Sequence, residues 1–127
     1  MAVYKIFPSK DSTIYSINPD INSGLDEILE ISYKNNLLNY FNSEISSPSF
    51  DYSDRSRILI HFDDLYNKIE ELNLTEYDLG LKLYIATASS LKDNLKIIAH
   101  PVSSFWENGI GKNSNNVLEG VSWNKST

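Results

Sequence analysis

The sequence predicts an all-β protein: an antiparallel β-sandwich or jelly roll with one short helix near residues 64–73. Two observations predict this class. Apolar and polar residues alternate in most segments, which is typical of strands with one buried face. Turn-forming combinations of asparagine, proline, aspartate and glycine separate these segments at short intervals, as in sandwiches and barrels. The length of 127 residues suits one domain, so we expect residues 1–127 to form a single β-sandwich domain.

The first half of the chain contains several runs of β-branched and aromatic residues. The strands expected there are residues 3–7, 12–17, 27–33 and 57–62. Asn18-Pro19-Asp20 and Asn22-Ser23-Gly24 break the second run, because these residues favour turns. Residues 34–54 have no clear period, and a connection of that length is usually functional or mobile in a compact domain.

The second half begins with the expected helix. Asp63 or Asp64 is expected to cap it with a carboxylate, and the helix should end near Asn73. Leu65, Ile69 and Leu72 have helical spacing on its apolar side. The strands expected after the helix are residues 79–87, 95–100, 103–106 and 117–123. The side chains expected to point inward from the first of these strands are Leu79, Leu81, Leu83 and Ile85.

Charge and composition exclude several classes of function. Seventeen acidic residues against eleven basic ones give a net charge of −6, which argues against a nucleic-acid partner. The absence of cysteine excludes disulfides, thiolate nucleophiles, zinc fingers and iron–sulfur sites. No apolar run approaches the length of roughly 20 residues that a membrane helix needs. Charged residues and a proline interrupt the N-terminal segment, so we expect neither a secretory signal nor a membrane partner.

Catalysis has no convincing set of residues in this sequence. His61 lies in an expected strand and His100 precedes a proline, and neither has a recognisable third partner for metal binding or acid–base chemistry. Asp63-Asp64 and Glu70-Glu71 are adjacent pairs, whereas a glycosidase needs two carboxyl groups facing each other across a sugar. Helix capping and solvation explain both pairs. We therefore expect a protein that is not an enzyme and has no catalytic residue.

The first turn region offers the hard oxygen ligands that calcium prefers, from Asp11, Asp20 and Asn22. The same residues are ordinary turn formers. We favour the turn interpretation and expect no cofactor, with calcium as the alternative.

Aromatic residues give the candidate binding sites. Trp106 and Trp123 could stack on a sugar, although packing against a sandwich is the favoured interpretation. Four aromatic residues lie in the polar connection and are candidates for a protein–protein interface: Tyr40, Phe41, Phe50 and Tyr52. Local packing under the loop is the equal alternative for these four residues.

Four segments carry a family resemblance when they are taken in order. They are Asp11-Ser12-Thr13-Ile14-Tyr15 followed by Asn22-Ser23-Gly24; residues 57–63 (RILIHFD); residues 79–84 (LGLKLY); and residues 101–109 (PVSSFWENG) ending in Gly120-Val121-Ser122-Trp123. This arrangement resembles the DNRLRE-type jelly-roll domain, which is similar to carbohydrate-binding modules. The opening, residues 4–30, also resembles the N-termini of structural proteins from tailed phages of marine bacteria.

The sequence departs from that family in three places. The third block begins Asp78-Leu79 without the usual alanine, and residues 34–54 are longer than a minimal domain needs. The family continues with further strands after the motif that ends at Trp123, whereas this sequence has four more residues. We therefore expect either that the last strand comes from elsewhere or that this is the N-terminal part of a longer product.

The resemblance implies a non-catalytic structural component of a tailed-phage virion. Such a protein would dock other virion proteins in the head, neck or tail, for instance as capsid decoration in a symmetric assembly, and would be found in virions assembled in the host cytoplasm. Nine lysines against two arginines, with fourteen asparagines and fourteen isoleucines, indicate an AT-rich source, which favours a phage. The alternative is a carbohydrate-binding module that recognises surface glycans.

Overall fold

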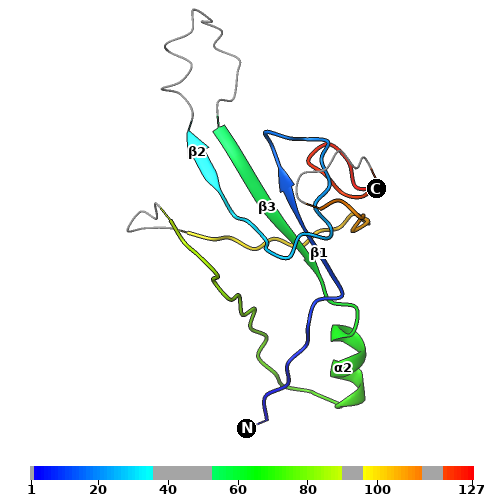
Figure 1. The fold of residues 1–127 in the computed structure, drawn as a ribbon. Coiled ribbons are helices and arrows are strands. Elements are labelled where there is room, and N and C mark those ends of the chain that lie inside the picture. The colour runs from blue at the N-terminus through cyan, green and yellow to red at the C-terminus, as the bar shows by residue number, and fades with distance from the viewer. Residues whose placement is uncertain (1, 36–52, 90–95, 113–118) are drawn as a thin grey trace, which may run out of the picture.

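The computed structural model describes residues 2–35, 53–89, 96–112 and 119–127. Its regular elements are β1 (Lys10–Tyr15), β2 (Tyr33–Asn35), β3 (Ser53–His61) and α2 (Leu65–Glu71), as Figure 1 shows. The three strands form one antiparallel sheet in the order β1-β3-β2. The expectation of a mostly non-helical chain with an antiparallel sheet and one short helix is therefore confirmed. None of the helices in these ranges is long and apolar enough to cross a bilayer.

Strand β3 is the centre of the sheet and pairs on both sides. Thr13 of β1 lies opposite Ile58, and Tyr33 of β2 lies opposite Arg55. The pairing with β1 continues one step further, because the backbone N–H of Ser16 donates to the carbonyl of Arg55 at 2.9 Å. β-branched residues in both strands favour this extended pairing.

Helix α2 occupies the expected position and ends as expected near Asn73. Asn73 adopts a positive φ of 50°, which is the left-handed conformation that often terminates helices. Its N–H donates to the carbonyl of Glu70 at 3.0 Å, and the N–H of Leu74 donates to the carbonyl of Ile69 at 3.3 Å. These two bonds form a Schellman motif, which satisfies carbonyl groups that would otherwise lack partners at the helix end.

The expected carboxylate cap at the start of α2 is wrong. Asp64 is the N-cap residue, but its side chain makes no capping hydrogen bond. Its backbone already has helical angles, with φ −86° and ψ −3°, whereas a side-chain cap normally uses an extended N-cap residue. Asp63 instead pairs with His61, with 2.6 Å between Oδ1 and Nε2.

Most of the other expected strands are not strands in the described residues. The segments concerned are residues 3–7, 27–32, 79–87, 96–100, 103–106 and 119–123. Alternation indicates an extended chain with two different faces, but a strand also needs a partner backbone. These segments have no such ladder within the described ranges, and the described strands form one sheet rather than two stacked sheets.

The apolar core of the described residues is small. Its buried apolar side chains are Trp106 and Val121, at 6% and 4% exposure. The buried polar side chains outnumber them: Ser12, Thr13, Asn22, Ser23, Ser56 and Ser122. They belong to β1, to β3 and to the turns that lie beside the sheet near the C-terminus (Figure 1). Hydrogen bonds between polar groups therefore determine how these turns are held.

Candidate functional site

Three turns that are far apart in the sequence meet around the side chain of Asn22, which is fully buried. Its Nδ2 donates to the carbonyl oxygens of Asn108 and Val121, each at 2.8 Å. Its Oδ1 accepts the backbone N–H groups of Gly24 at 3.1 Å and Gly111 at 2.8 Å. We name these five residues the Asn22 clasp. Because the amide is satisfied at both ends, it fixes the three turns relative to one another.

The turns approach one another closely because glycines lie where they meet. Gly120 has a φ of +94°, a conformation that side chains rarely adopt. A Cβ added there would lie 2.5 Å from the Cα of Gly109. A Cβ on Gly24 would overlap the backbone carbonyl of Asn108. The clasp therefore requires glycine at both positions.

Ser23 occupies the outer edge of β1 at Thr13. In an antiparallel pair, every second residue directs its backbone N–H and C=O toward the partner strand. Ser16 bonds to Arg55 of β3, so Thr13, three residues earlier, directs its N–H and C=O away from β3. Ser23 Oγ accepts the N–H of Thr13 at 3.1 Å and donates to its carbonyl at 2.5 Å. One hydroxyl thus satisfies both edge groups of Thr13, as a neighbouring strand would.

The opposite edge of the sheet has no neighbouring strand among the described residues. Ser56 of β3 donates its N–H to the carbonyl of Ser32 at 3.0 Å. Antiparallel alternation then places the backbone N–H and C=O of Ile31 and Tyr33 on the side away from β3. Ile31 donates no backbone hydrogen bond to any described residue, and its side chain is 48% exposed. We name residues 29–33 the open edge.

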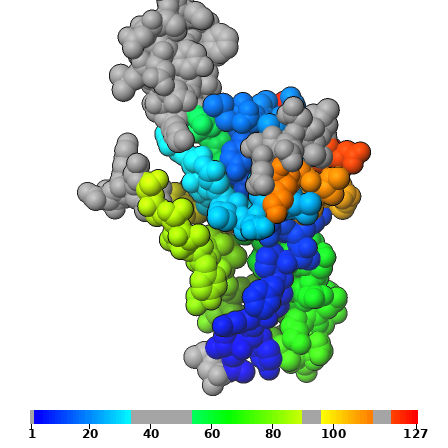
Figure 2. All heavy atoms as spheres, viewed as in Figure 1, coloured from blue at the N-terminus to red at the C-terminus, as the bar shows by residue number. Residues whose placement is uncertain are grey.

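A second exposed feature is the segment 79–85, which we name the donor segment. Its four alternating apolar side chains were expected to point inward, and that expectation is wrong. Their exposed fractions are 66% for Leu79, 56% for Leu81, 44% for Leu83 and 78% for Ile85. Figure 2 shows the yellow-green stretch of chain that contains them as a ridge along one side of the molecule. Two features of the sequence indicated this surface: apolar residues alternate along the segment, and only one of its seven residues is charged.

The two tryptophans expected to pack or to bind sugars lie near neighbouring strands of the sheet, Trp106 beside Lys10 of β1 and Trp123 beside Arg57 of β3. Trp106 is buried, and Lys10 Nζ lies 4.5 Å from its ring centre and donates to its carbonyl at 2.6 Å. Trp123 is half-buried, with the Arg57 guanidinium 4.8 Å from its ring centre. Stacking on a sugar requires an open ring face. Trp106 offers none here, and a cation covers one face of Trp123.

Two of the three candidate calcium ligands, Asn22 and Asp20, have other partners. Asn22 Oδ1 accepts two N–H groups, which occupies both lone pairs of an amide oxygen. Asp20 Oδ1 accepts a hydrogen bond from Asn124 Nδ2 at 3.0 Å, and Asp11 lies opposite Ile60 in the sheet. No cluster of three acidic, histidine or cysteine side chains that could hold a metal ion occurs in the described part of the chain.

The titratable residues lie on the surface. The paired side chains of His61 and Asp63 are 47% and 67% exposed, and His100 is also exposed. Tyr15 is the exception, because burial and, secondly, the Glu30 carboxylate raise its pKa above the ordinary value of 10.0. Its hydroxyl lies 3.5 Å from Glu30 Oε2. A raised tyrosine pKa keeps this group neutral and gives it no evident role in acid–base catalysis.

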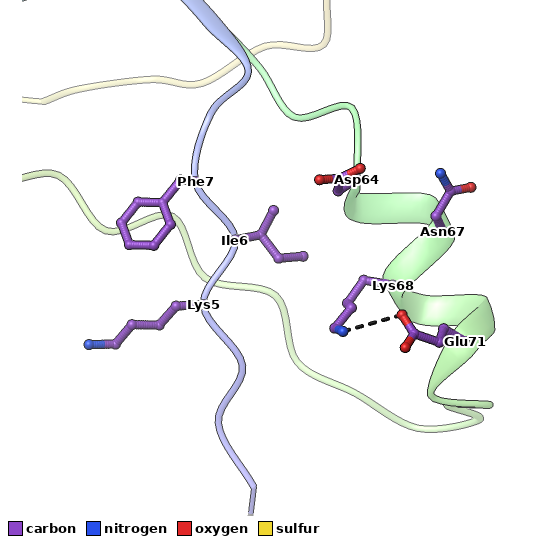
Figure 3. Close-up of a pocket in the computed structure, with 7 residues that line it drawn as sticks. All are labelled: Lys5, Ile6, Phe7, Asp64, Asn67, Lys68 and Glu71. Carbon is purple, nitrogen blue, oxygen red and sulfur yellow. Dashed lines mark hydrogen bonds and ion pairs between the residues drawn. The ribbon is translucent and has the colours of Figure 1, made fainter.

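A pocket of about 490 Å³ lies between the N-terminal segment and α2 (Figure 3). Ile6 points toward the helix, whereas Lys5 and Phe7 turn away from it. On the helix side, Lys68 Nζ pairs with Glu71 Oε2 at 3.2 Å. The two charges neutralise each other at the surface, so the pocket resembles a hollow between packed segments rather than a catalytic cleft.

The remaining interface candidates, Tyr40, Phe41, Phe50 and Tyr52, lie outside the described residues. Comparison with known proteins adds no relative, since no family model, no curated protein and no solved structure matches the chain.

Proposed function

We propose that this chain is a non-catalytic assembly module that acts by docking onto other proteins, as a structural component of a tailed-phage virion. The observation that carries the proposal is the exposure of alternating apolar side chains in the donor segment, together with the open edge of the sheet. Isolated exposed apolar residues are common, but a continuous alternating run is typical of a strand that needs a partner.

The clasp supports the proposed jelly-roll relationship. Two of the four motif blocks that resemble the DNRLRE-type domain meet in space: the first contains Asn22, and the fourth contains its partners Asn108 and Val121. In this proposal the sandwich is completed when the extended apolar segments pair with partner strands. The net charge of −6 would keep the unassembled chain soluble.

Glycan recognition is the competing function. It needs exposed aromatic faces, whereas Trp106 is buried and Trp123 is half-buried under Arg57. These contacts favour docking to protein over stacking on sugar.

Particles purified from the source culture on a density gradient would test the proposal. Quantitative mass spectrometry should detect this chain in the particle fraction, at a fixed copy number relative to the most abundant particle protein. Absence from purified particles would refute the virion assignment.

A parallel titration of the full chain with host surface polysaccharide, followed by tryptophan fluorescence, tests the competing function. We expect no saturable change. Saturable binding that Trp123→Ala abolishes and Trp106→Phe retains would replace docking with glycan recognition.

A further inference from the structure

We propose that the open edge, residues 29–33, accepts the donor segment, residues 79–85, of a second copy of this chain as an added β-strand. The inference rests on the proposed docking function and names its first partner. On the β1 edge, Ser23 satisfies the outward backbone groups of Thr13. On the opposite edge, the outward backbone groups of Tyr33 have no neighbouring strand among the described residues.

Backbone geometry fits the open edge to a strand. Ser32 directs its backbone groups toward β3: its N–H donates to Ser56 Oγ at 2.7 Å and its carbonyl accepts the N–H of Ser56 at 3.0 Å. The N–H of Glu30 instead donates at 3.0 Å to Thr13 Oγ1 of β1, the strand on the far side of β3. The alternate residues Ile31 and Tyr33 therefore direct theirs outward. Such alternation is the template to which an extended chain adds by hydrogen bonding.

Side chains near the edge match the donor segment in polarity. Ile28, Ile31 and Tyr33 are 64%, 48% and 66% exposed, and the donor segment offers four exposed aliphatic side chains at alternate positions. Aliphatic and aromatic pairs across strands stabilise sheets.

Charge points to this chain itself as the partner. The open edge carries one acidic side chain, Glu30, and no basic one, whereas the donor segment carries Lys82 and no acidic one. An acidic protein would repel a second copy at most surfaces, but here Lys82 of one copy would approach Glu30 of the other.

Cysteine cross-linking tests the contact directly, because the chain has no cysteine of its own. Full-length Ile31→Cys is mixed with full-length Leu81→Cys, and separately with Leu83→Cys to cover the register, under mild oxidation. The matched control partner is Tyr66→Cys, whose site on α2 is 68% exposed. Cross-strand neighbours lie within disulfide reach, so we expect mixed dimers roughly tenfold or more above the control.

Yields equal to the control in both registers would overturn the proposal. A chain carrying both Ile31→Cys and Leu81→Cys that cross-links only within itself would also overturn it, because the donor segment would then occupy its own edge. Charge exchange provides a second measurement. Lys82→Glu should reduce the mass of the full chain in light scattering toward 14.5 kDa, and adding Glu30→Lys should restore the larger mass.

Failure of this inference can be told apart from failure of the proposed function. If the chain stays monomeric and does not cross-link but is found in purified particles, it docks only to other proteins. That result would refute the self-pairing and support the proposed virion function. If the chain cross-links as expected but is missing from purified particles, the result would support the self-pairing and refute the virion role.

Discussion

Replacing Asn22 should destabilise the protein more than any other single asparagine substitution that we can identify in the described residues. Asn22→Ala removes four hydrogen bonds, two donated and two accepted, from a fully buried site. At about 1 kcal/mol for each bond, the expected loss of unfolding free energy is about 4 kcal/mol. Because a typical domain has only about 5–15 kcal/mol of stability, such a loss would be visible in any denaturation curve.

The assay is urea unfolding followed by tryptophan fluorescence and by circular dichroism. Asn124→Ala is the matched control, since the Asn124 side chain makes one hydrogen bond, to Asp20, on an exposed surface, and should cost less than about 1 kcal/mol. Similar losses for the two alanine variants would refute the clasp as the main tie between the turns.

An isosteric variant separates hydrogen bonding from volume. Asn22→Asp keeps the shape but replaces the amide donor with an oxygen that faces the carbonyls of Asn108 and Val121. Burying this charge with one oxygen against two carbonyl oxygens should cost at least as much as the alanine variant near neutral pH. Partial recovery at low pH, where the carboxyl can donate one bond, would support the assignment of Nδ2. Wild-type stability at neutral pH would contradict it.

Three further perturbations probe the surroundings of the clasp. Gly120→Ala must strain a φ of +94° and should cost roughly 1–3 kcal/mol; an unchanged melting temperature would contradict this. Ser23→Ala leaves both edge groups of Thr13 unpaired, and should cost roughly 1–3 kcal/mol and speed hydrogen exchange of the Thr13 amide. Burial, followed by Glu30, raises the pKa of Tyr15, so its contribution to stability is present below pH 10 and is lost as pH rises through the folded pKa. Tyr15→Phe should flatten the alkaline decline of the unfolding free energy.

Local patterns predicted those elements whose stabilising interactions are also local. Helix α2 follows from the spacing of Leu65, Ile69 and Leu72, and its end is set by the left-handed Asn73. Strands β1 and β3 lie within or beside the expected segments, although their bounds differ by several residues. Strand pairing is a property of two segments, so the alternation in residues 79–87 could indicate an extended chain but could not supply its partner.

The clasp was beyond sequence reasoning for a similar reason. Asn22 was recognised as a turn residue and as a possible oxygen ligand, but its four partners lie up to 99 positions away. The available signal was glycine: four of the five glycines in the chain lie at positions 24, 109, 111 and 120, within the turns that meet at Asn22. Glycine permits close backbone approach, so their clustering could have indicated turns that touch.

The contrast between the clasp and the exposed apolar segments links folding to assembly. Directional hydrogen bonds around Asn22 determine how the turns are arranged, but the net stabilisation from each such bond is modest. Most folding free energy comes from apolar burial, and the described residues bury only two apolar side chains, those of Trp106 and Val121. Burial of the donor segment against a partner would supply the missing apolar contribution. The stability of the chain should therefore rise with its own concentration, as expected when association and folding are coupled, and a melting temperature independent of concentration would argue against self-pairing.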